Sequence, residues 1–251
     1  MYMTSDIDSG ASAARPARYK TVKEEIVRAL SQGRWKRGQK IASEPQLAER
    51  HGVSIGTIRR AVGELVAENI LTRTQGSGTY VVSHTPDYML NAFFRIVDRE
   101  GHKELPTLDR FNMRSTRADA ATAAALRLRP RATVIEIETL LSLQGRPTIL
   151  DRMRLPPALF PDLTERVFAH REGTVYGLFQ QRFGITVVRL EEFVTAVAST
   201  SRERRLLGVE PGAPLLQVQR TAYTYKDVPV DYRVRLIDST RHGYQSVIGA
   251  G

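Results

Sequence analysis

The chain has 251 residues, a formal net charge of +10 and no cysteine. This length is comfortable for two domains, and the lack of cysteine excludes disulfides and thiolate chemistry. No apolar run approaches the ~18 residues that a transmembrane helix needs, so none is expected. Residues 1–17 have no apolar segment of the kind found in secretory signals and are expected to form a disordered tail. We therefore expect a cytoplasmic protein.

The positive charge is densest in the first third of the chain. Residues 1–82 carry 13 Lys and Arg against 8 Asp and Glu, which is half of the net charge in a third of the length. A local basic cluster lies at residues 34–40. Such an excess suggests an anionic partner such as nucleic acid. A solvated basic face is the alternative, and charge alone does not decide between them.

Three helical patterns occupy residues 19–67. The first, from Tyr19 to Ser31, is amphipathic. Ser43 and Gln46 then form a capping box that begins a second helix, and Ser54 caps a third after a break at Gly52. The third helix has one apolar face and small and basic residues at its exposed N-terminal end. This pattern fits a helix-turn-helix whose second helix enters a major groove.

The stretch from Leu71 to Val82 changes to a strand-like period. Two short runs flank a glycine-rich tip, Gln75–Gly78, which is typical of a hairpin. Three helices followed by a hairpin predict a winged helix over residues 18–82. Its tip would lie against the sugar-phosphate backbone or in a minor groove, where glycine permits close approach. A simple tight turn is the alternative explanation for the glycines.

The remainder of the chain reads as a second domain of mixed type. Residues 83–90 are polar, contain Pro86 and are predicted to be a linker. Between residues 91 and 248, long strand-like runs form hairpins over 134–155 and 215–236, and shorter helical stretches interrupt them. Because hairpins predominate, we expect an α+β domain with a mainly antiparallel sheet and helices packed against it.

Two regions of the chain resemble known families. SEPQLAERHGVSIGTIRRAVGELVAENILTRTQGSGTYVV resembles the DNA-binding domain of GntR-family bacterial transcription regulators. ALRLRPRATVIEIETLLSLQGRPTILDRMRLPPALFPDL, GTVYGLFQQRFG and GVEPGAPLLQVQRTAYTYKDVPVDYRVRLID resemble the UTRA effector-binding domain of the HutC subfamily. The resemblance implies a chorismate lyase-like C-terminal fold and a homodimer on palindromic double-stranded operator DNA. It also implies a repressor that a small-molecule effector releases from that DNA.

The resemblance places candidate DNA contacts on the third helix and the hairpin. Thr57 and Arg59 match positions from which the family's recognition helix touches DNA, and a guanidinium can read guanine or hold phosphate. The alternative is a solvated helix face, and for Ser43 a capping role. The full set is Ser43, Ser54, Gly56, Thr57, Arg59, Arg60, Arg73, Gln75, Gly76, Ser77, Gly78 and Thr79.

Two positions depart from the family pattern. Ile55 and Pro45 stand where many family members carry arginine. The resemblance assigns those positions to base reading or phosphate contact. We therefore expect an operator that differs from the family's usual half-site.

Candidate effector contacts begin with Thr174 and Tyr176. In sugar-phosphate-binding relatives, residues of these types help to hold the phosphate, and a helix N-terminus at this point favours an anion. Those relatives also use two arginines at the positions of Thr139 and Leu141. The loss of both favours a carboxylate or another polar metabolite over a sugar phosphate.

The remaining effector candidates are Asp151, Arg152, Tyr232 and Arg233. Asp151 falls at an acidic position that the family often uses for polar groups of the ligand. Either Arg152 or Arg233 could replace the missing positive charge. Side chains alternate between the faces of a strand, and the sequence does not decide which arginine faces the pocket. A plain sheet-surface position is the alternative for each residue.

An enzyme is the rival interpretation, because the implied C-terminal fold resembles a lyase. The sequence contains no zinc-protease, serine-hydrolase or phosphate-loop motif. Its five histidines are scattered, at His51, His84, His102, His170 and His242. We therefore predict no catalysis, no cofactor and no metal. A nucleic-acid-binding architectural protein is a further alternative, but it leaves the large second domain unexplained.

Overall fold

The computed structural model describes residues 18–247. The tail predicted at residues 1–17 and residue 248, the predicted end of the second domain, lie outside this range. The chain divides into two units, residues up to Val82 and residues from Ser83 onward.

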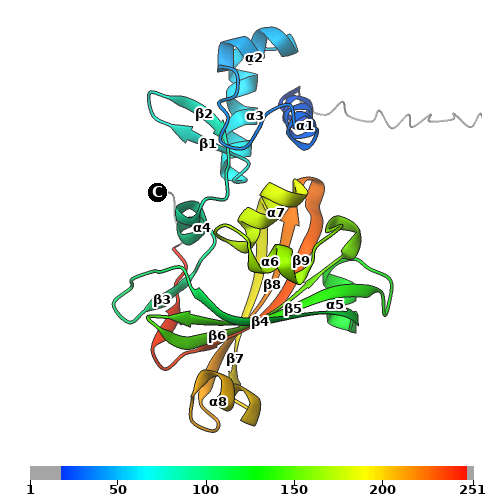
Figure 1. Cartoon of the computed structure of the whole chain (residues 1–251). Helices are drawn as coiled ribbons and strands as arrows, with labels where there is room; N and C mark the ends of the chain where they lie inside the picture. Colours follow the sequence, from blue (N-terminus) through cyan, green and yellow to red (C-terminus); the bar gives the residue numbers. More distant parts are fainter. Residues whose placement is uncertain (1–17, 248–251) are drawn as a thin grey trace, which may run out of the picture. The chain divides into compact units, whose positions relative to one another are not determined.

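The first unit contains three helices and a hairpin (Figure 1). These are α1 (Arg18–Ser31), α2 (Glu44–His51), α3 (Ile55–Ala67), β1 (Leu71–Thr74) and β2 (Gly78–Val81). Helix α3 packs on both other helices, and it buries Ile58, Ala61, Val62 and Leu65. This is the predicted winged helix, and its apolar residues recur at the spacing of one helix face.

Two serines begin the helices of the helix-turn-helix. The Ser43 hydroxyl accepts the backbone N–H of Gln46, whose side chain accepts the backbone N–H of Ser43 at 3.0 Å. The Ser54 hydroxyl accepts the backbone N–H of Thr57 at 3.2 Å. Such caps typically stabilise a helix by about 1 kcal/mol. Both serines therefore have a structural role that does not depend on DNA.

The second unit is organised around an antiparallel sheet. Within residues 83–247, six strands pair in the order β4-β5-β6-β9-β8-β7, and β3 pairs with β10 in a separate ribbon. The strands are β3 (Ile96–Asp98), β4 (Thr107–Arg117), β5 (Thr133–Leu143), β6 (Arg146–Leu155), β7 (Arg189–Ala198), β8 (Pro214–Thr224), β9 (Val228–Asp238) and β10 (His242–Tyr244). The predicted α+β class with a mainly antiparallel sheet is confirmed.

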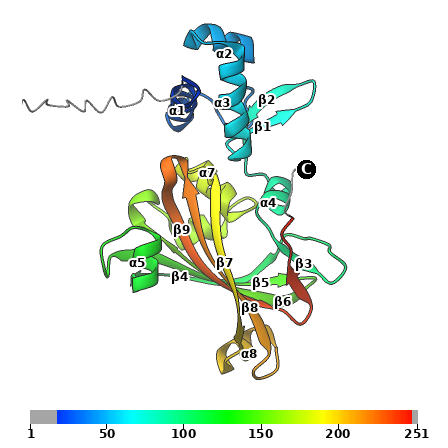
Figure 2. The same ribbon diagram turned by 180° about the vertical axis from the view of Figure 1, so that it is seen from behind.

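Short helices cover both faces of this sheet. They are α4 (Pro86–Ala92), α5 (Ala120–Ala125), α6 (Glu165–Ala169), α7 (Val175–Phe183) and α8 (Ser201–Leu207), with single turns at Pro157–Leu159 and Tyr225–Asp227. On one face, Phe168 of α6 and Phe179 of α7 pack in an apolar cluster with Ile137 and Met153 of the sheet (Figure 1). The opposite face, seen from behind in Figure 2, carries α5 near Val134.

More than half of the predicted linker, residues 83–90, belongs to α4, which Thr85 caps. His84 anchors the start of this segment within the second unit. Its backbone N–H donates to Gln180 Oε1 of α7 at 3.0 Å, and its Nε2 lies 2.8 Å from the carbonyl oxygen of Val187. Burial lowers the pKa of His84 to about 4. The neutral ring therefore donates its Nε2–H to Val187 at neutral pH.

We expect mild acid to destabilise the second unit through His84. The pKa of His84 in the folded protein lies below its ordinary value of 6.5, so the unfolded state takes up a proton first as the pH falls. The contribution of the neutral ring is complete above pH 6.5. As the pH falls from 6.5, the pKa of His84 in the unfolded chain, to about 4, its pKa in the folded chain, this contribution is lost. The free energy of unfolding then decreases by up to about 3 kcal/mol.

Urea unfolding at about pH 7, 6 and 5 measures this loss. Near-ultraviolet circular dichroism follows mainly the second unit, which holds six of the nine tyrosines, and fluorescence of the single tryptophan, Trp35, reports on the first unit separately. The His84→Gln variant should lose less stability over the same range. An equal loss in both proteins would contradict the assignment.

Candidate DNA interface and effector cavity

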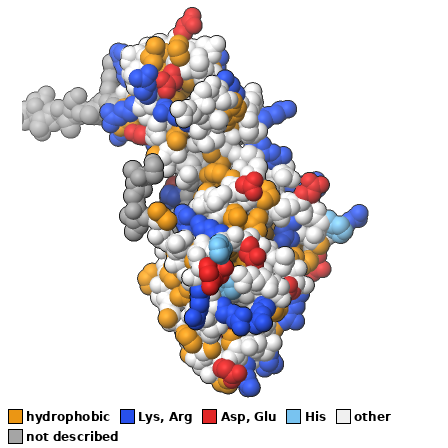
Figure 3. All heavy atoms as spheres, turned by 90° about the vertical axis from the view of Figure 1, so that its left-hand side faces the viewer, with side chains coloured by type: hydrophobic (Ala, Val, Ile, Leu, Met, Phe, Trp, Pro, Cys, Tyr) orange, Lys and Arg blue, Asp and Glu red, His pale blue; other side chains and the backbone are white. Residues whose placement is uncertain are grey.

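The twelve candidate DNA contacts lie at the starts of α2 and α3 and along the β1–β2 hairpin. Nine of them are exposed, and Thr57, Gly78 and Thr79 are half-buried. A duplex can therefore reach this surface. On the face in Figure 3, Lys and Arg side chains lie among acidic and apolar ones on both units. The helix start and the hairpin mark the interface better than charge does.

Glu44, at the start of α2, joins the third helix to the hairpin. Its Oε2 accepts a hydrogen bond from Arg59 Nε of α3, and its Oε1 accepts one from Arg73 Nη2 of β1, each at 3.0 Å. One carboxylate thus orients two candidate DNA-binding guanidinium groups. Each arginine has five N–H donors and keeps several for phosphate or base. No local sequence pattern predicts this pairing, because the partners lie 15 and 29 positions apart.

Arg60 and Gly78 have roles within the unit itself. The guanidinium carbon of Arg60 lies 3.8 Å from the centroid of the Tyr19 ring. Gly78 has φ +133°, a conformation that side-chain-bearing residues rarely adopt. The hairpin therefore requires glycine at this position whether or not DNA approaches it, which supports the tight-turn explanation for Gly78.

The second unit contains a cavity of about 390 Å³. Thr139 of β5 and Asp151 of β6 line it from the sheet, and Phe93 and Phe168 line it from the helical side. This volume falls in the ordinary range for small-molecule sites. The cavity therefore has room for a small metabolite.

Three arginines line the cavity from neighbouring strands: Arg220 of β8 and Arg233 and Arg235 of β9. Each is at most 7% exposed. Alternation along β9 places Arg233 and Arg235 on one face, and the β8–β9 register sets Arg220 opposite Arg233. The register of the sheet thus gathers three positive charges at one site.

Buried carboxylates balance these charges. Asp151 Oδ2 accepts from Arg233 Nη1 at 3.1 Å and from Arg235 Nη2 at 2.7 Å. Asp231 Oδ2 accepts a hydrogen bond from Arg233 Nε at 2.8 Å, and Arg220 pairs with Glu192. Buried charges of this kind are tolerated only when they are paired and hydrogen-bonded.

The two aspartates respond differently to burial. For Asp151, burial acts to raise the pKa, but the charges of Arg235 and Arg233 outweigh it and the pKa is lowered. For Asp231, burial dominates the effect of Arg233 and raises the pKa. Asp151 is therefore the firmly ionised member of the pair.

Several polar atoms of the cavity lining lack a hydrogen-bond partner. Among residues 18–247, Asp151 Oδ1, Arg171 Nε and Arg235 Nε are buried and have none. A buried polar atom without a partner costs about 1–3 kcal/mol. A ligand that supplied the missing partners would recover part of that free energy.

The start of α7 also faces the cavity. Thr174, Val175 and Tyr176 belong to its lining. The Thr174 hydroxyl caps the helix by accepting the Gly177 N–H at 3.1 Å. Tyr176 Oη donates to Asp231 Oδ2 at 3.0 Å, and burial raises the pKa of this phenol. The two hydroxyl residues predicted as effector contacts are thus both engaged within the unit.

Four of the six predicted effector residues line the cavity, namely Asp151, Thr174, Tyr176 and Arg233. The other two predicted residues, Arg152 and Tyr232, do not line this cavity. Each lies one residue from a lining position, so its side chain points to the opposite face of the sheet. There Arg152 pairs with Glu138 at 3.0 Å, and Tyr232 packs in the cluster that includes α5 residues. Of the two arginines left open by the sequence, Arg233 faces the cavity.

Three cavity arginines were not predicted: Arg171, Arg220 and Arg235. The two-residue spacing from Arg233 could have identified Arg235. Arg220 follows only from the β8–β9 register, and Arg171 only from the packing of the segment before α7.

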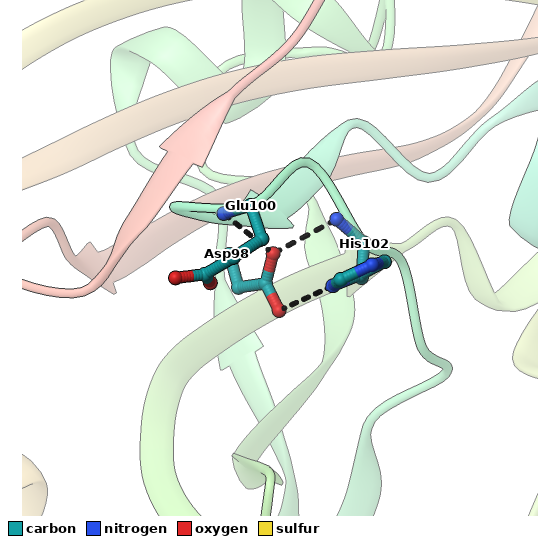
Figure 4. A group of neighbouring side chains, drawn as sticks. All are labelled: Asp98, Glu100 and His102. Atoms are coloured by element: carbon teal, nitrogen blue, oxygen red, sulfur yellow. Dashed lines mark hydrogen bonds and ion pairs between the residues drawn. The ribbon is translucent and has the colours of Figure 1, made fainter.

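Asp98 at the end of β3 forms a separate polar cluster with Glu100 and His102 of the following loop (Figure 4). The carboxylate of Asp98 accepts the backbone N–H groups of Glu100 and His102 at 3.1 and 2.8 Å. Its second oxygen lies 3.3 Å from His102 Nδ1 and accepts from Gln144 Nε2 at 3.1 Å. Both oxygens therefore have a structural role in the loop.

Comparison with known proteins agrees with the two units. Residues 18–81 match the gntR family of bacterial regulatory proteins, and residues 106–242 match the UTRA domain. The chain is 28% identical over 233 residues to the probable fructoselysine utilization operon transcriptional repressor of Escherichia coli K12, covering 89% of this chain and 95% of that one. It is 27% identical over 227 residues to the histidine utilization repressor of Pseudomonas putida, covering 89% of each.

Solved structures give the same result for the second unit. The ligand-binding domain of a putative GntR-family regulator from Bordetella bronchiseptica matches with a TM-score of 0.58 and 37% identity, over 62% of this chain and 98% of that one. PhnF from Mycobacterium smegmatis shares the fold, with a TM-score of 0.52 and 24% identity over 92% of this chain and 100% of that one.

A winged helix followed by a ligand-binding α+β domain defines a DNA-binding transcription regulator rather than an enzyme. The chain belongs to the GntR family of bacterial regulatory proteins and carries a UTRA domain. No helix in the described part of the chain has the length and apolar character to cross a membrane.

Replacing Glu44 by Gln should reduce the discrimination between operator and unrelated DNA. The variant loses the carboxylate that orients Arg59 and Arg73, and it also loses a charge that repels phosphate. Affinity for a scrambled duplex should be unchanged or higher, while the operator-to-scrambled ratio falls roughly tenfold, as for one lost base contact. Fluorescence anisotropy with both duplexes at one salt concentration measures this ratio. Glu49→Gln, which removes an exposed charge from the same helix, is the control, and equal effects of the two variants would contradict the role of Glu44.

Proposed function

We propose that the chain is a homodimeric repressor that a small organic anion, a carboxylate rather than a sugar phosphate, releases from its operator. The main support for this proposal is the arginine-lined cavity in a domain that follows a winged helix. Both named curated relatives are described as repressors of utilization pathways, which supports a role in catabolic gene control.

We assign the DNA contacts to the predicted set. Thr57 and Arg59 enter the major groove from the start of α3, and Arg73 and the hairpin tip meet the backbone. Ser43 and Ser54 combine capping with phosphate contact. Ile55 and Pro45 are exposed and offer no guanidinium to DNA. Because these two positions lack arginine, we expect the operator to differ from the family's usual half-site.

The charge around the cavity supports a carboxylate over a sugar phosphate. Thr139 and Leu141 line the cavity without charge. Arg220, Arg233 and Arg235 are already paired with carboxylates. A phosphate dianion would need more uncompensated positive charge than this arrangement leaves.

Helix α7 connects the cavity to the segment that leads to the DNA-binding unit. Its first residues line the cavity, and Gln180, further along, holds the backbone of His84. A Cβ added to Gly177 would stand 3.3 Å from the His84 carbonyl oxygen, so the helix and this segment are in close contact. Because Val82 ends the first unit, a ligand that shifts α7 also shifts the point where that unit is attached. The ligand and the DNA then weaken each other's binding by the same factor.

Strand β7 supports the proposed dimer. It lies at the end of the sheet and pairs only with β8 among residues 83–247. Phe193, at its middle, is 63% exposed. An unpaired strand edge with an exposed aromatic ring favours pairing with another chain. Two copies pairing β7 antiparallel about a two-fold axis would match a palindromic operator.

The function is tested by DNA binding and its loss. Fluorescence anisotropy with duplexes from the protein's own promoter region should show tighter binding than with scrambled duplexes. A carboxylate that raises the unfolding temperature should lower this affinity by roughly 5–150-fold, the usual range of coupling between sites. Equal binding to both duplexes would contradict the regulator, and ligand binding without DNA release would contradict the switch.

The Phe193→Glu variant should raise the dissociation constant of the dimer at least tenfold. Burying a phenyl ring at a two-fold interface removes apolar surface from water on both chains, and a carboxylate there would be desolvated twice. Size-exclusion chromatography with light scattering over a concentration series measures the shift. Val228→Glu, at another exposed apolar residue, should leave the dimer intact. A dimer unchanged by Phe193→Glu would place the interface elsewhere.

A further inference from the structure

The cavity wall has a polar side and an apolar side. The sheet presents Asp151 and Arg235, buried to 4% and 7% exposure. Met89 of α4, Phe93 directly after this helix, and Phe168 present apolar side chains to the same space. Removing apolar ligand surface from water favours binding in proportion to the area buried. A ligand with an apolar body therefore gains more here than a fully hydroxylated one.

Arg171 is the cavity cation that no carboxylate neutralises within residues 18–247. Its Nη1 donates to the carbonyl oxygen of Phe168 at 2.7 Å, and its guanidinium carbon lies 4.3 Å from the centroid of the Phe168 ring. These contacts hold the group in place while its Nε remains without a partner. The N-terminus of α7 lines the same region through Thr174, and helix N-termini favour anions.

The unpartnered polar atoms of the sheet are complementary to a ligand group other than a carboxylate. Asp151 Oδ1 requires a donor, and Arg235 Nε requires an acceptor. A hydroxyl supplies both, since it donates one hydrogen bond and accepts others. An ammonium group has donors only. It would also be repelled by Arg233 and Arg235, which already pair with Asp151.

We propose that the effector is an apolar-bodied hydroxycarboxylic acid. Its carboxylate binds Arg171 beside the start of α7, its hydroxyl binds Asp151 and Arg235, and its body packs on Met89, Phe93 and Phe168. This inference rests on the proposed function of the cavity as the effector site. It narrows the ligand to one carboxylate, one hydroxyl and an aliphatic or aromatic remainder.

Matched probes on one body test the three parts of this assignment. With the full chain, thermal shift and calorimetry compare 3-phenyllactate with 3-phenylpropionate, phenylalanine and 3-phenyllactamide. A branched aliphatic series built on 2-hydroxyisocaproate is run in parallel, together with glucose 6-phosphate. In at least one series the hydroxy acid should bind roughly tenfold or more tightly than its partners, the effect of one lost charge-assisted hydrogen bond.

Substitutions assign the carboxylate. Arg171→Gln should lower the affinity for the hydroxy acid at least tenfold. Arg171→Lys should lower this affinity less, because the positive charge is kept. Arg166→Gln removes a charge from the exposed surface of α6 and should change nothing. The unfolding temperature of each variant without ligand shows whether it is folded.

Three outcomes would overturn the inference: a sugar phosphate or an amide that binds as tightly as the hydroxy acid, no binding by any hydroxy acid, or an Arg171→Gln variant with unchanged affinity. Promoter binding by the ligand-free chain distinguishes a wrong ligand class from a wrong proposed function. If promoter DNA binds specifically and no hydroxy acid does, the ligand class is wrong and the regulator stands. If promoter DNA is not recognised, the proposed function itself fails.

Discussion

Three arginines buried on one sheet face need carboxylates beside them, and this requirement shapes the second unit. The register of β6, β9, β8 and β7 supplies the carboxylates. Asp151 stands across from Arg235, and Glu192 across from Arg220. A slip of one residue between β6 and β9, or between β8 and β7, would move a charge to the opposite face and leave its partner uncompensated. The same register keeps the cavity polar on its sheet side, while the helices close it with aromatic side chains.

The charge balance is also the basis of the proposal that the site takes a small organic anion. Ion pairs between β6 and β9 and between β8 and β7 neutralise most of the positive charge at the sheet. What remains is a positioned guanidinium at Arg171, a helix N-terminus, and buried polar atoms on Asp151 and Arg235 without partners. Each is a feature that a ligand can complete, and all belong to one lining. Helix α7 shares this lining and holds His84, so occupation of the cavity and the position of the chain before α4 depend on one helix.

Much of the fold could be predicted because the signals are local. Capping residues such as Ser43 and Ser54 act on backbone within three positions, and the hairpin over 71–82 follows from its turn. The face of Arg233 could not be predicted, because alternation fixes relative faces but not which one meets the helices. The sequence therefore does not separate Arg233 from Arg152 and Tyr232, which lie on the opposite face of the sheet. Arg220, Arg171 and the pairing of Glu44 with Arg59 depend on strand register or packing between distant segments, which no local pattern encodes.

In the proposed switch, α7 transmits ligand binding to the segment at His84. Amide hydrogen exchange, measured with and without a saturating cavity ligand, tests this coupling. The exchange rate of the His84 amide, which donates to Gln180, should change together with the rates of the α7 amides. If α7 amides respond to the ligand while the His84 amide keeps its rate, the helix does not connect the cavity to the DNA-binding unit, and the proposed switch is contradicted.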